Sequence, residues 1–166
     1  MTNMVGKIRV ACCAFALGML APMALGAQQG SPNTIEIVVG NGPFAGTYKQ
    51  PSRGDEVLCM SLKQSPHEFA ATWRDVTPTS KTVLAEAGVG ISNPDAADAK
   101  RGHAAVTFGN PAKNPTRYEV NVPGSAGSGT LSMSRSGSRV DIVFVGRTKD
   151  GIQLRITAKC LDIDSM

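Results

Sequence analysis

The chain has 166 residues, and its 17 basic and 13 acidic side chains give a formal net charge of +4 at neutral pH. Two of the basic residues belong to an N-terminal segment that we expect to be removed, which leaves 15 against 13, a net charge of +2. The sequence has no cluster of Lys and Arg interleaved with aromatic side chains, which argues against binding to nucleic acid.

The first 27 residues have the pattern of a secretory signal peptide. Two basic residues, Lys7 and Arg9, precede an apolar run over residues 10–25 that ends in small side chains. The run is short for a membrane span, which needs about 20 apolar residues. We therefore predict a cleaved leader, with cleavage after Gly26 or Ala27, rather than a retained anchor. The mature protein is expected to be secreted or periplasmic in a bacterium, without a stable membrane span.

About 140 residues follow the leader, enough for one domain with its own hydrophobic core. We predict a single all-β domain over residues 28–166, because strand-forming runs alternate with turn residues at roughly ten-residue spacing. The expected architecture is an antiparallel β-sandwich or a partly open barrel of about ten short strands. The predicted strands are residues 34–39, 44–49, 57–62, 68–74, 82–87, 103–109, 117–122, 130–135, 139–148 and 152–160.

Two segments between these strands are interpreted as irregular. Residues 91–102 contain Ser92 and Asn93, either of which can cap one helical turn, and at most that turn is expected there. Residues 123–129 are rich in Gly and Ser and are expected to form a flexible surface connector. They lack the Lys-Ser/Thr pair that a phosphate-binding loop requires.

The last two strands form the clearest hairpin of the sequence. A two-residue turn at Asp150-Gly151 would place polar residues of one strand opposite apolar residues of the other. A three-residue turn that includes Lys149 shifts the register by one and puts Ile156 and Phe144 on the same face. We therefore predict the three-residue turn, with Gly151 in the left-handed conformation that such turns require.

A second hairpin is predicted immediately before this one. A two-residue turn around residues 136–138 keeps the apolar side chains of both strands on one face. The expected pairing matches Leu131 and Met133 to Val140 and Ile142.

Two cysteines, Cys59 and Cys160, remain after the leader is removed. An even pair in an exported chain predicts a disulfide, which would stabilise the fold by about 4–5 kcal/mol in the chain-entropy model. Two buried free thiols are the alternative. The spacing of these cysteines and of the two histidines, His67 and His103, does not fit a zinc site.

The sequence gives no support for an enzyme or a cofactor. His67 and His103 are interpreted as exposed loop residues rather than as general bases. No Gly-x-Ser-x-Gly motif is present in the sequence. Asp95 and Asp98 lack the alternating oxygen ligands of a calcium loop. We expect no catalytic activity and no bound metal.

Several side chains are candidates for an interaction surface. The only tryptophan, Trp73, shares the parity of Phe69 and is assigned to the core. Tyr48 and Tyr118 are the aromatic candidates for an exposed face. The C-terminal strands are rich in cations, which either protect strand edges or bind an anionic surface or polymer. These cations are Arg135, Arg139, Arg147, Lys149, Arg155 and Lys159, of which Arg147 and Lys149 are the leading candidates.

The layout of residues 54–160 resembles the mycobacterial surface lipoprotein antigen family. The similarity consists of an early cysteine, Cys59, a Gly-x-Gly segment at residues 127–129, and the last-strand Cys160. Unlike that family, this sequence has no cysteine at the predicted cleavage site for lipid attachment. The resemblance implies a disulfide-linked, non-catalytic envelope module, and no catalytic residue is carried over.

Three functional hypotheses follow from these features. The leading one is a non-catalytic binding or structural module of the envelope, whose partner is an envelope or extracellular protein or polymer. The second is an inhibitor of an exported hydrolase, such as a lysozyme or protease, acting through residues 110–116 or 123–129. The third is a hydrolase that uses carboxylates such as Asp55, Glu56 or Asp141.

Overall fold

The computed structural model describes residues 33–49, 57–62, 68–75, 83–94 and 101–161. Within these ranges the chain forms ten β-strands and no helix, which confirms the predicted fold class. No helix in this part of the chain is long and apolar enough to cross a membrane. The strands are β1 (Thr34–Val39), β2 (Gly46–Lys49), β3 (Leu58–Leu62), β4 (Glu68–Arg74), β5 (Leu84–Ser92), β6 (Arg101–Phe108), β7 (Thr116–Val122), β8 (Gly127–Ser136), β9 (Arg139–Thr148) and β10 (Gln153–Leu161).

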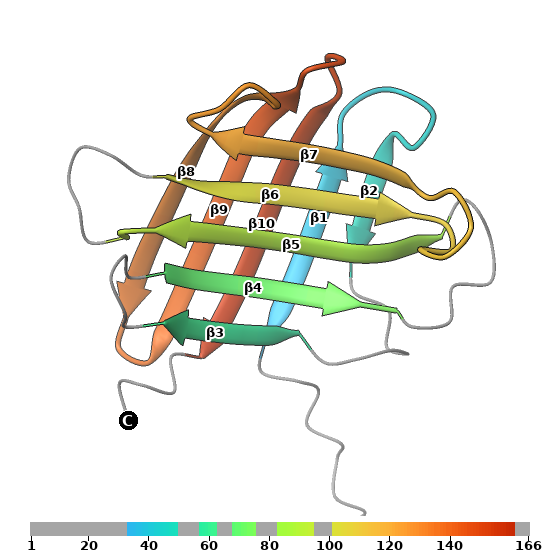
Figure 1. Ribbon diagram of the computed structural model, residues 1–166. Coiled ribbons are helices and arrows are strands. Elements are labelled where there is room, and N and C mark those ends of the chain that lie inside the picture. Colours follow the sequence, from blue (N-terminus) through green and yellow to red (C-terminus); the bar gives the residue numbers. More distant parts are fainter. Residues whose placement is uncertain (1–32, 50–56, 63–67, 76–82, 95–100, 162–166) are drawn as a thin grey trace, which may run out of the picture.

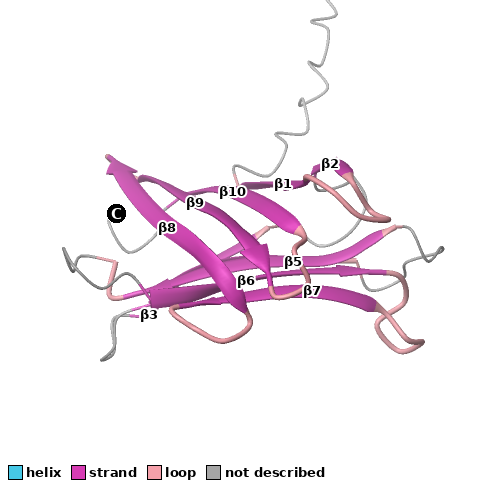
Figure 2. Cartoon of the chain, turned by 90° about the horizontal axis from the view of Figure 1, so that it is seen from above, coloured by secondary structure: helices cyan, strands magenta, loops and turns pink. Residues whose placement is uncertain are grey.

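The strands form two antiparallel sheets of five. Sheet A has the order β2-β1-β10-β9-β8, and sheet B has the order β3-β4-β5-β6-β7. The strands of sheet B run across those of sheet A at a steep angle (Figure 1), and the two sheets lie face to face as separate layers (Figure 2). The molecule is therefore a β-sandwich and not a closed barrel.

The space between the sheets is filled by the alternate, apolar side chains of both layers. Ile37 and Ile156, which pair across β1 and β10, are fully buried from sheet A. Phe69 and Trp73 of β4 fill the core from sheet B, and Trp73 is only 1% exposed, as its parity predicts. The indole Nε1 of Trp73 is buried without a hydrogen-bond partner.

The β9–β10 hairpin has the predicted register. Val140 lies opposite Cys160, and Phe144 lies opposite Ile156, so the apolar side chains of both strands share the buried face. The turn is closed by a 2.9 Å hydrogen bond from the Thr148 amide to the Ile152 carbonyl. Gly151 has φ +82°, the left-handed conformation expected at the last turn position.

The β8–β9 hairpin has the predicted two-residue turn and one of the two expected cross-strand partners, Ile142. Ser136 lies opposite Arg139, and Gly137 has φ +59°. In this register Leu131 faces Phe144 and Met133 faces Ile142, whereas we had expected Val140 as a partner. Because the turn pairs Ser136 with Arg139, Val140 lies opposite Arg135 and not opposite Leu131 or Met133. The same side chains still face the core.

Several predicted boundaries are wrong, and the main errors concern the two segments interpreted as irregular. Strand β5 continues to Ser92 and β6 begins at Arg101, so both ends of the predicted loop 91–102 are strand. Residues 95–100 lie outside the described residues. The predicted connector 123–129 is shorter, because β8 begins at Gly127. Gly127 has φ +135°, a conformation that glycine adopts without a Cβ penalty and that allows a strand to start directly after the corner.

A disulfide joins the two sheets, as predicted. Cys59 lies on β3 at the edge of sheet B, and Cys160 lies on β10 in the interior of sheet A, with their Cα atoms 5.9 Å apart. The bond excludes the alternative of two free thiols. Because it closes 101 residues of sequence, it restricts the unfolded chain strongly.

Two asparagines extend the pairing of β1 with β10 beyond both ends of β1. At one end, Asn33 accepts from the Leu161 amide (2.8 Å) and donates to the Val57 carbonyl (3.1 Å). At the other end, Asn41 accepts from the Gln153 amide (2.7 Å) and donates to the Gly151 carbonyl (3.1 Å). Asn33 thus bonds two backbone segments that are far apart in the sequence, and Asn41 bonds two positions at the start of β10 and in the turn before it.

Candidate functional site

The outer face of sheet A is polar and rich in hydroxyl groups. Along the edge strand β8, every outward position is an exposed Ser or Thr, and successive hydroxyl groups are about 6.8 Å apart along the strand. We call these side chains the hydroxyl row: Ser128, Thr130, Ser132, Ser134 and Ser136. On the neighbouring β9, Val145 and Arg147 face outward, and Arg155 faces outward on β10.

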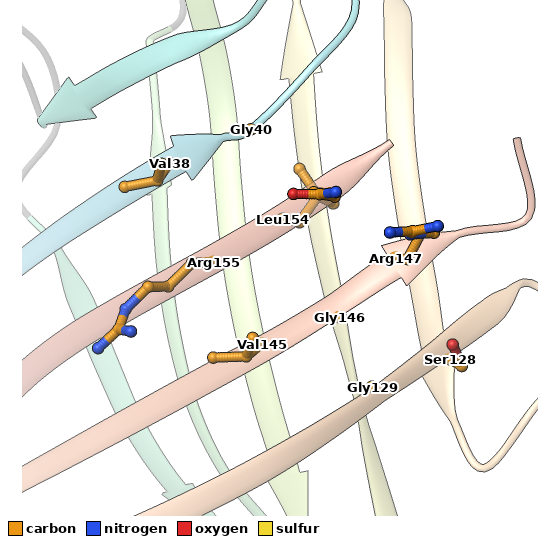
Figure 3. A pocket seen from close by; sticks show the side chains of 10 residues that line it. Val38, Gly40, Ser128, Gly129, Val145, Gly146, Arg147, Leu154 and Arg155 are labelled. Atoms are coloured by element: carbon orange, nitrogen blue, oxygen red, sulfur yellow. The ribbon is translucent and has the colours of Figure 1, made fainter. Parts of the chain in front are cut away.

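A shallow trough of about 480 Å³ lies on this face, where β8, β9, β10 and β1 run side by side. Its sides combine apolar surface from Val38 and Val145 with polar groups from Arg147, Arg155 and Gln153. In Figure 3 the guanidinium groups of Arg147 and Arg155 lie apart on the neighbouring strands β9 and β10, and Val145 stands on β9 beside Arg155. The remaining lining residues are Gly40, Ser128, Gly129, Gly146 and Leu154.

On the core side of the sheet beneath the trough, two glycines face each other across β8 and β9. Gly129 pairs with Gly146, and the ring of Phe144 covers both from the core side. A Cβ at Gly129 would lie 2.6 Å from Phe144 Cε2, and one at Gly146 would collide with the same ring. The aromatic ring replaces the side-chain packing that the two glycines lack, a known way of stabilising glycine in a sheet.

The charges of the trough are available for a ligand. Neither Arg147 nor Arg155 has an ion-pair partner among the residues that the structure describes. On the outer face of sheet B, by contrast, Arg117 pairs with Glu86 at 3.7 Å and with Glu119 at 3.0 Å. A guanidinium without a partner can bind carboxylate, sulfate or phosphate without first breaking an internal bond.

Tyr48 and Tyr118 do not form an exposed face. Both are half-buried, and their rings contact Phe108 with centroids 5.0 and 6.0 Å away. Tyr48 donates a 2.9 Å hydrogen bond from Oη to the carbonyl of Phe44, whose ring is stacked on Phe108. Burial raises the pKa of Tyr118 above its ordinary value of 10.0, and the neighbouring Tyr48 adds to this rise.

The predicted candidates therefore separate into two places. The tyrosines Tyr48 and Tyr118 lie together in an aromatic cluster between the sheets, and Arg147 lines the trough. Lys149 is exposed in the β9–β10 turn, and none of the contacts found in the described ranges joins it to the tyrosines.

The trough could not be located from the sequence, because it requires β8, β9, β10 and β1 to lie side by side in their observed register. Gly129 and Gly146 lie at equal distances from the two-residue turn that begins at Gly137. This symmetric spacing is the signal in the sequence that could have indicated the β8–β9 register.

His103 lies in a strand, as the predicted strand 103–109 implies, but it is half-buried rather than an exposed loop residue. It is the third residue of β6 and lies over Gly90 on the outer face of sheet B. His67, Asp95 and Asp98 lie outside the described residues. Within the described ranges, no group of three or more His, Cys, Asp or Glu side chains is placed to hold a metal ion. Comparisons with protein-family models, curated proteins and solved structures gave no significant match to this chain.

Proposed function

We propose that the protein is an exported, non-catalytic binding module of the bacterial cell envelope, and that its ligand is an anionic polymer bound along the outer face of sheet A. The observation that supports this proposal most directly is the pair of guanidinium groups, Arg147 and Arg155, that line the trough. Both are free of carboxylate partners within the described residues.

The chemistry of the trough suits a chain that carries repeated negative charges and some apolar surface. Each guanidinium can bind an acidic oxygen pair through two hydrogen bonds. Val38 and Val145 offer apolar contact on either side of Arg155, and Val145 is 46% exposed. The hydroxyl row of β8 provides neutral donors and acceptors beside them. An acidic polysaccharide or a phosphate-containing polymer has groups that match the guanidinium groups, the apolar valines and the hydroxyl row.

Two observations support an exported location. The leader predicted from the sequence is followed by a chain whose two remaining cysteines form a disulfide, and disulfides persist mainly in oxidising compartments. The resemblance in layout to mycobacterial surface lipoprotein antigens agrees with this part of the proposal. It adds the expectation of a role at the cell surface.

The non-catalytic part of the proposal rests on the sequence, which has no motif that joins a nucleophile to a base. One carboxylate of the hydrolase hypothesis, Asp141, lies on the outer side of β9 opposite Ser134 and Lys159. The other two, Asp55 and Glu56, lie outside the described residues. Turnover of a bound polymer that disappears in Asp141→Asn would overturn this part.

Binding is tested with the mature protein and immobilised polymers of opposite character: a sulfated polysaccharide and polyphosphate as anionic probes, and dextran as the neutral one. Removal of both cations in Arg147→Ala/Arg155→Ala should weaken binding of an anionic probe by at least about tenfold, because hydrogen bonds to charged groups contribute roughly 1.5–3 kcal/mol each. Wild-type binding should also weaken as salt is raised.

The matched control is Arg101→Ala/Lys113→Ala, which removes the same two charges from exposed positions outside sheet A. This variant should bind as wild type does. Equal losses in the two variants would show that only net charge matters, and no binding of either anionic probe by the wild type would equally overturn the proposed site.

A second candidate function, inhibition of an exported hydrolase, is favoured by the order of the loop after β6. The Asn110 side chain accepts from the Ala112 amide at 2.9 Å, and the Asn110 carbonyl accepts from the Lys113 amide at 2.9 Å. Residues 111–115 are all exposed, and Asn114 has φ +51°. An ordered, protruding loop can enter a cleft at low entropic cost. Loss of inhibition of a lysozyme when 111–115 is replaced by Gly-Ser residues would support it.

A further inference from the structure

The edge of sheet B formed by β3 exposes three large apolar side chains next to one another. Leu58, Met60 and Leu62 occupy alternate positions on the outer face, and they are 56%, 40% and 52% exposed. Strand β3 ends the order of sheet B and pairs only with β4 within that sheet. An edge of this kind presents backbone donors and acceptors to a further strand.

The other three edge strands carry charges that discourage such pairing. Strand β2 has four residues and ends in Lys49, which is paired with Glu36 at 3.3 Å. On β7, Arg117 and Glu119 face outward in the ion-pair network. On β8, Arg135 is on the inward-facing side, 6.0 Å from the ring of Phe69. Charges on edge strands and inward-pointing charges are common protections against edge-to-edge association. Strand β3, Leu-Cys-Met-Ser-Leu, has none.

We propose that β3 pairs in antiparallel orientation with β3 of a second copy of this chain, with the twofold axis at Met60. The strand has a leucine two residues before and two residues after Met60. This register therefore places Leu58 opposite Leu62 of the second copy and the two Met60 side chains opposite each other. A surface that matches itself in this way is the requirement for a symmetric dimer.

The paired strands form one apolar patch. A twofold axis perpendicular to the sheet keeps both outer faces on the same side, so the six apolar side chains become neighbours. Side chains directly opposite each other in antiparallel strands have Cβ atoms about 4.5–5.5 Å apart, and each covers part of its partner. Since β3 has no charge, the interface contains no like charges that oppose each other across the axis.

The disulfide holds β3 in place before a second copy binds. Cys59, on the opposite face of β3 from Met60, is bonded to Cys160 in the interior of sheet A. The edge is thus attached to the core before a second copy arrives, which lowers the entropic cost of pairing.

The size of the interface sets its strength. Standard interfaces bury about 800 Å² per partner, whereas a five-residue strand is only about 17 Å long. The dimer is therefore weak, with a dissociation constant of about 10 µM to 1 mM.

The test is sedimentation velocity of the mature, disulfide-bonded chain from about 5 µM to 1 mM, a range chosen to span the expected dissociation constant. The wild type should shift from monomer towards dimer. Met60→Lys and Met60→Glu should each weaken self-association by roughly 100-fold or more, because two like charges then face each other at the axis. An equimolar mixture of the two variants should restore the dimer. The matched control, Val145→Lys on sheet A, should dimerise as the wild type does.

Three other outcomes of this experiment would overturn the proposal. A wild type that stays monomeric at the highest concentration excludes self-pairing, and would leave the strand of another protein as the occupant of β3. A dimer that persists in Met60→Lys excludes β3 as the interface, and variants that are monomeric alone but do not combine exclude the axis at Met60. Circular dichroism of each variant shows that it is folded, and the wild-type dilution series needs no substitution.

Discussion

The two outer faces of the sandwich differ in how their charges are used. On sheet A, Arg147 and Arg155 have no partner within the described residues and line the trough. On sheet B, Arg117 is bonded to two carboxylates, and the centre of the face is made of small residues such as Gly88 and Ala105. The difference teaches that the two faces are distinguished by the pairing of their charges, which is the observation behind the proposed anionic ligand.

The two sheets also differ in the space that surrounds their glycines. On sheet A, Gly129 and Gly146 are required, because the ring of Phe144 occupies the space that their side chains would need. On sheet B, a Cβ at Gly88 would meet the Thr72 methyl at 3.5 Å, an ordinary contact. Sheet A is thus closely packed beneath its trough, while sheet B has room for a methyl group at Gly88.

The largest expected effect comes from cutting the covalent link between the two sheets. Replacement of both cysteines in Cys59→Ser/Cys160→Ser should lower the free energy of unfolding by about 2–5 kcal/mol, because the bond closes 101 residues of sequence. Urea denaturation of the variant measures this loss. Reduction of the wild type serves as the control, since it opens the bond without a substitution. An unchanged midpoint in both would mean that the sheets are held together by packing alone.

A pair of alanine substitutions sharpens the comparison of the faces. Gly146→Ala should lower the free energy of unfolding by about 1–3 kcal/mol, because the added methyl group overpacks against Phe144. Gly88→Ala should leave it unchanged or raise it by up to about 1 kcal/mol, since the unfolded chain loses freedom and no clash arises. Thermal unfolding of the two variants side by side gives the difference. Similar losses in both would contradict the contrast in packing.

The smallest effect concerns the aromatic cluster at alkaline pH. Because burial raises the pKa of Tyr118, the unfolded chain loses this proton first, and stability should decrease as pH rises above about 10. Below that pH the phenol is neutral in both states and contributes no pH dependence. Tyr118→Phe should therefore make the decrease shallower, as measured by urea midpoints at about pH 8 and pH 11. An equally steep decrease in the variant would assign it to another group.

Sequence patterns of short range predicted the fold well. The alternation in β1 and β10 reflects one buried and one exposed face, and the turn at Gly151 fixed the register of β9 with β10. The boundaries failed where glycines lie inside strands. Gly88 and Gly90 have low strand propensity, yet they belong to β5 because β4 and β6 pair with it on both sides.

The candidate site was predictable only in part. Cations on the C-terminal strands follow from the sequence, but the trough requires β8, β9, β10 and β1 to lie side by side. Tyr48 and Tyr118 could not be placed correctly, because their burial depends on Phe44 and Phe108 from two other segments. The exposed stripe of β3 was also missed, since a run that is apolar on both faces resembles a fully buried strand.

The two asparagines at the ends of β1 have a mechanical consequence. A force applied lengthwise along β1 would load the hydrogen bonds to both neighbouring strands at the same time. Because β1 is bonded to β2 and β10 along its length and clamped by Asn33 and Asn41 at its ends, many hydrogen bonds must break together before it slides. Strand β1 is thus fastened to its neighbours so that a shearing load is shared by all of these bonds.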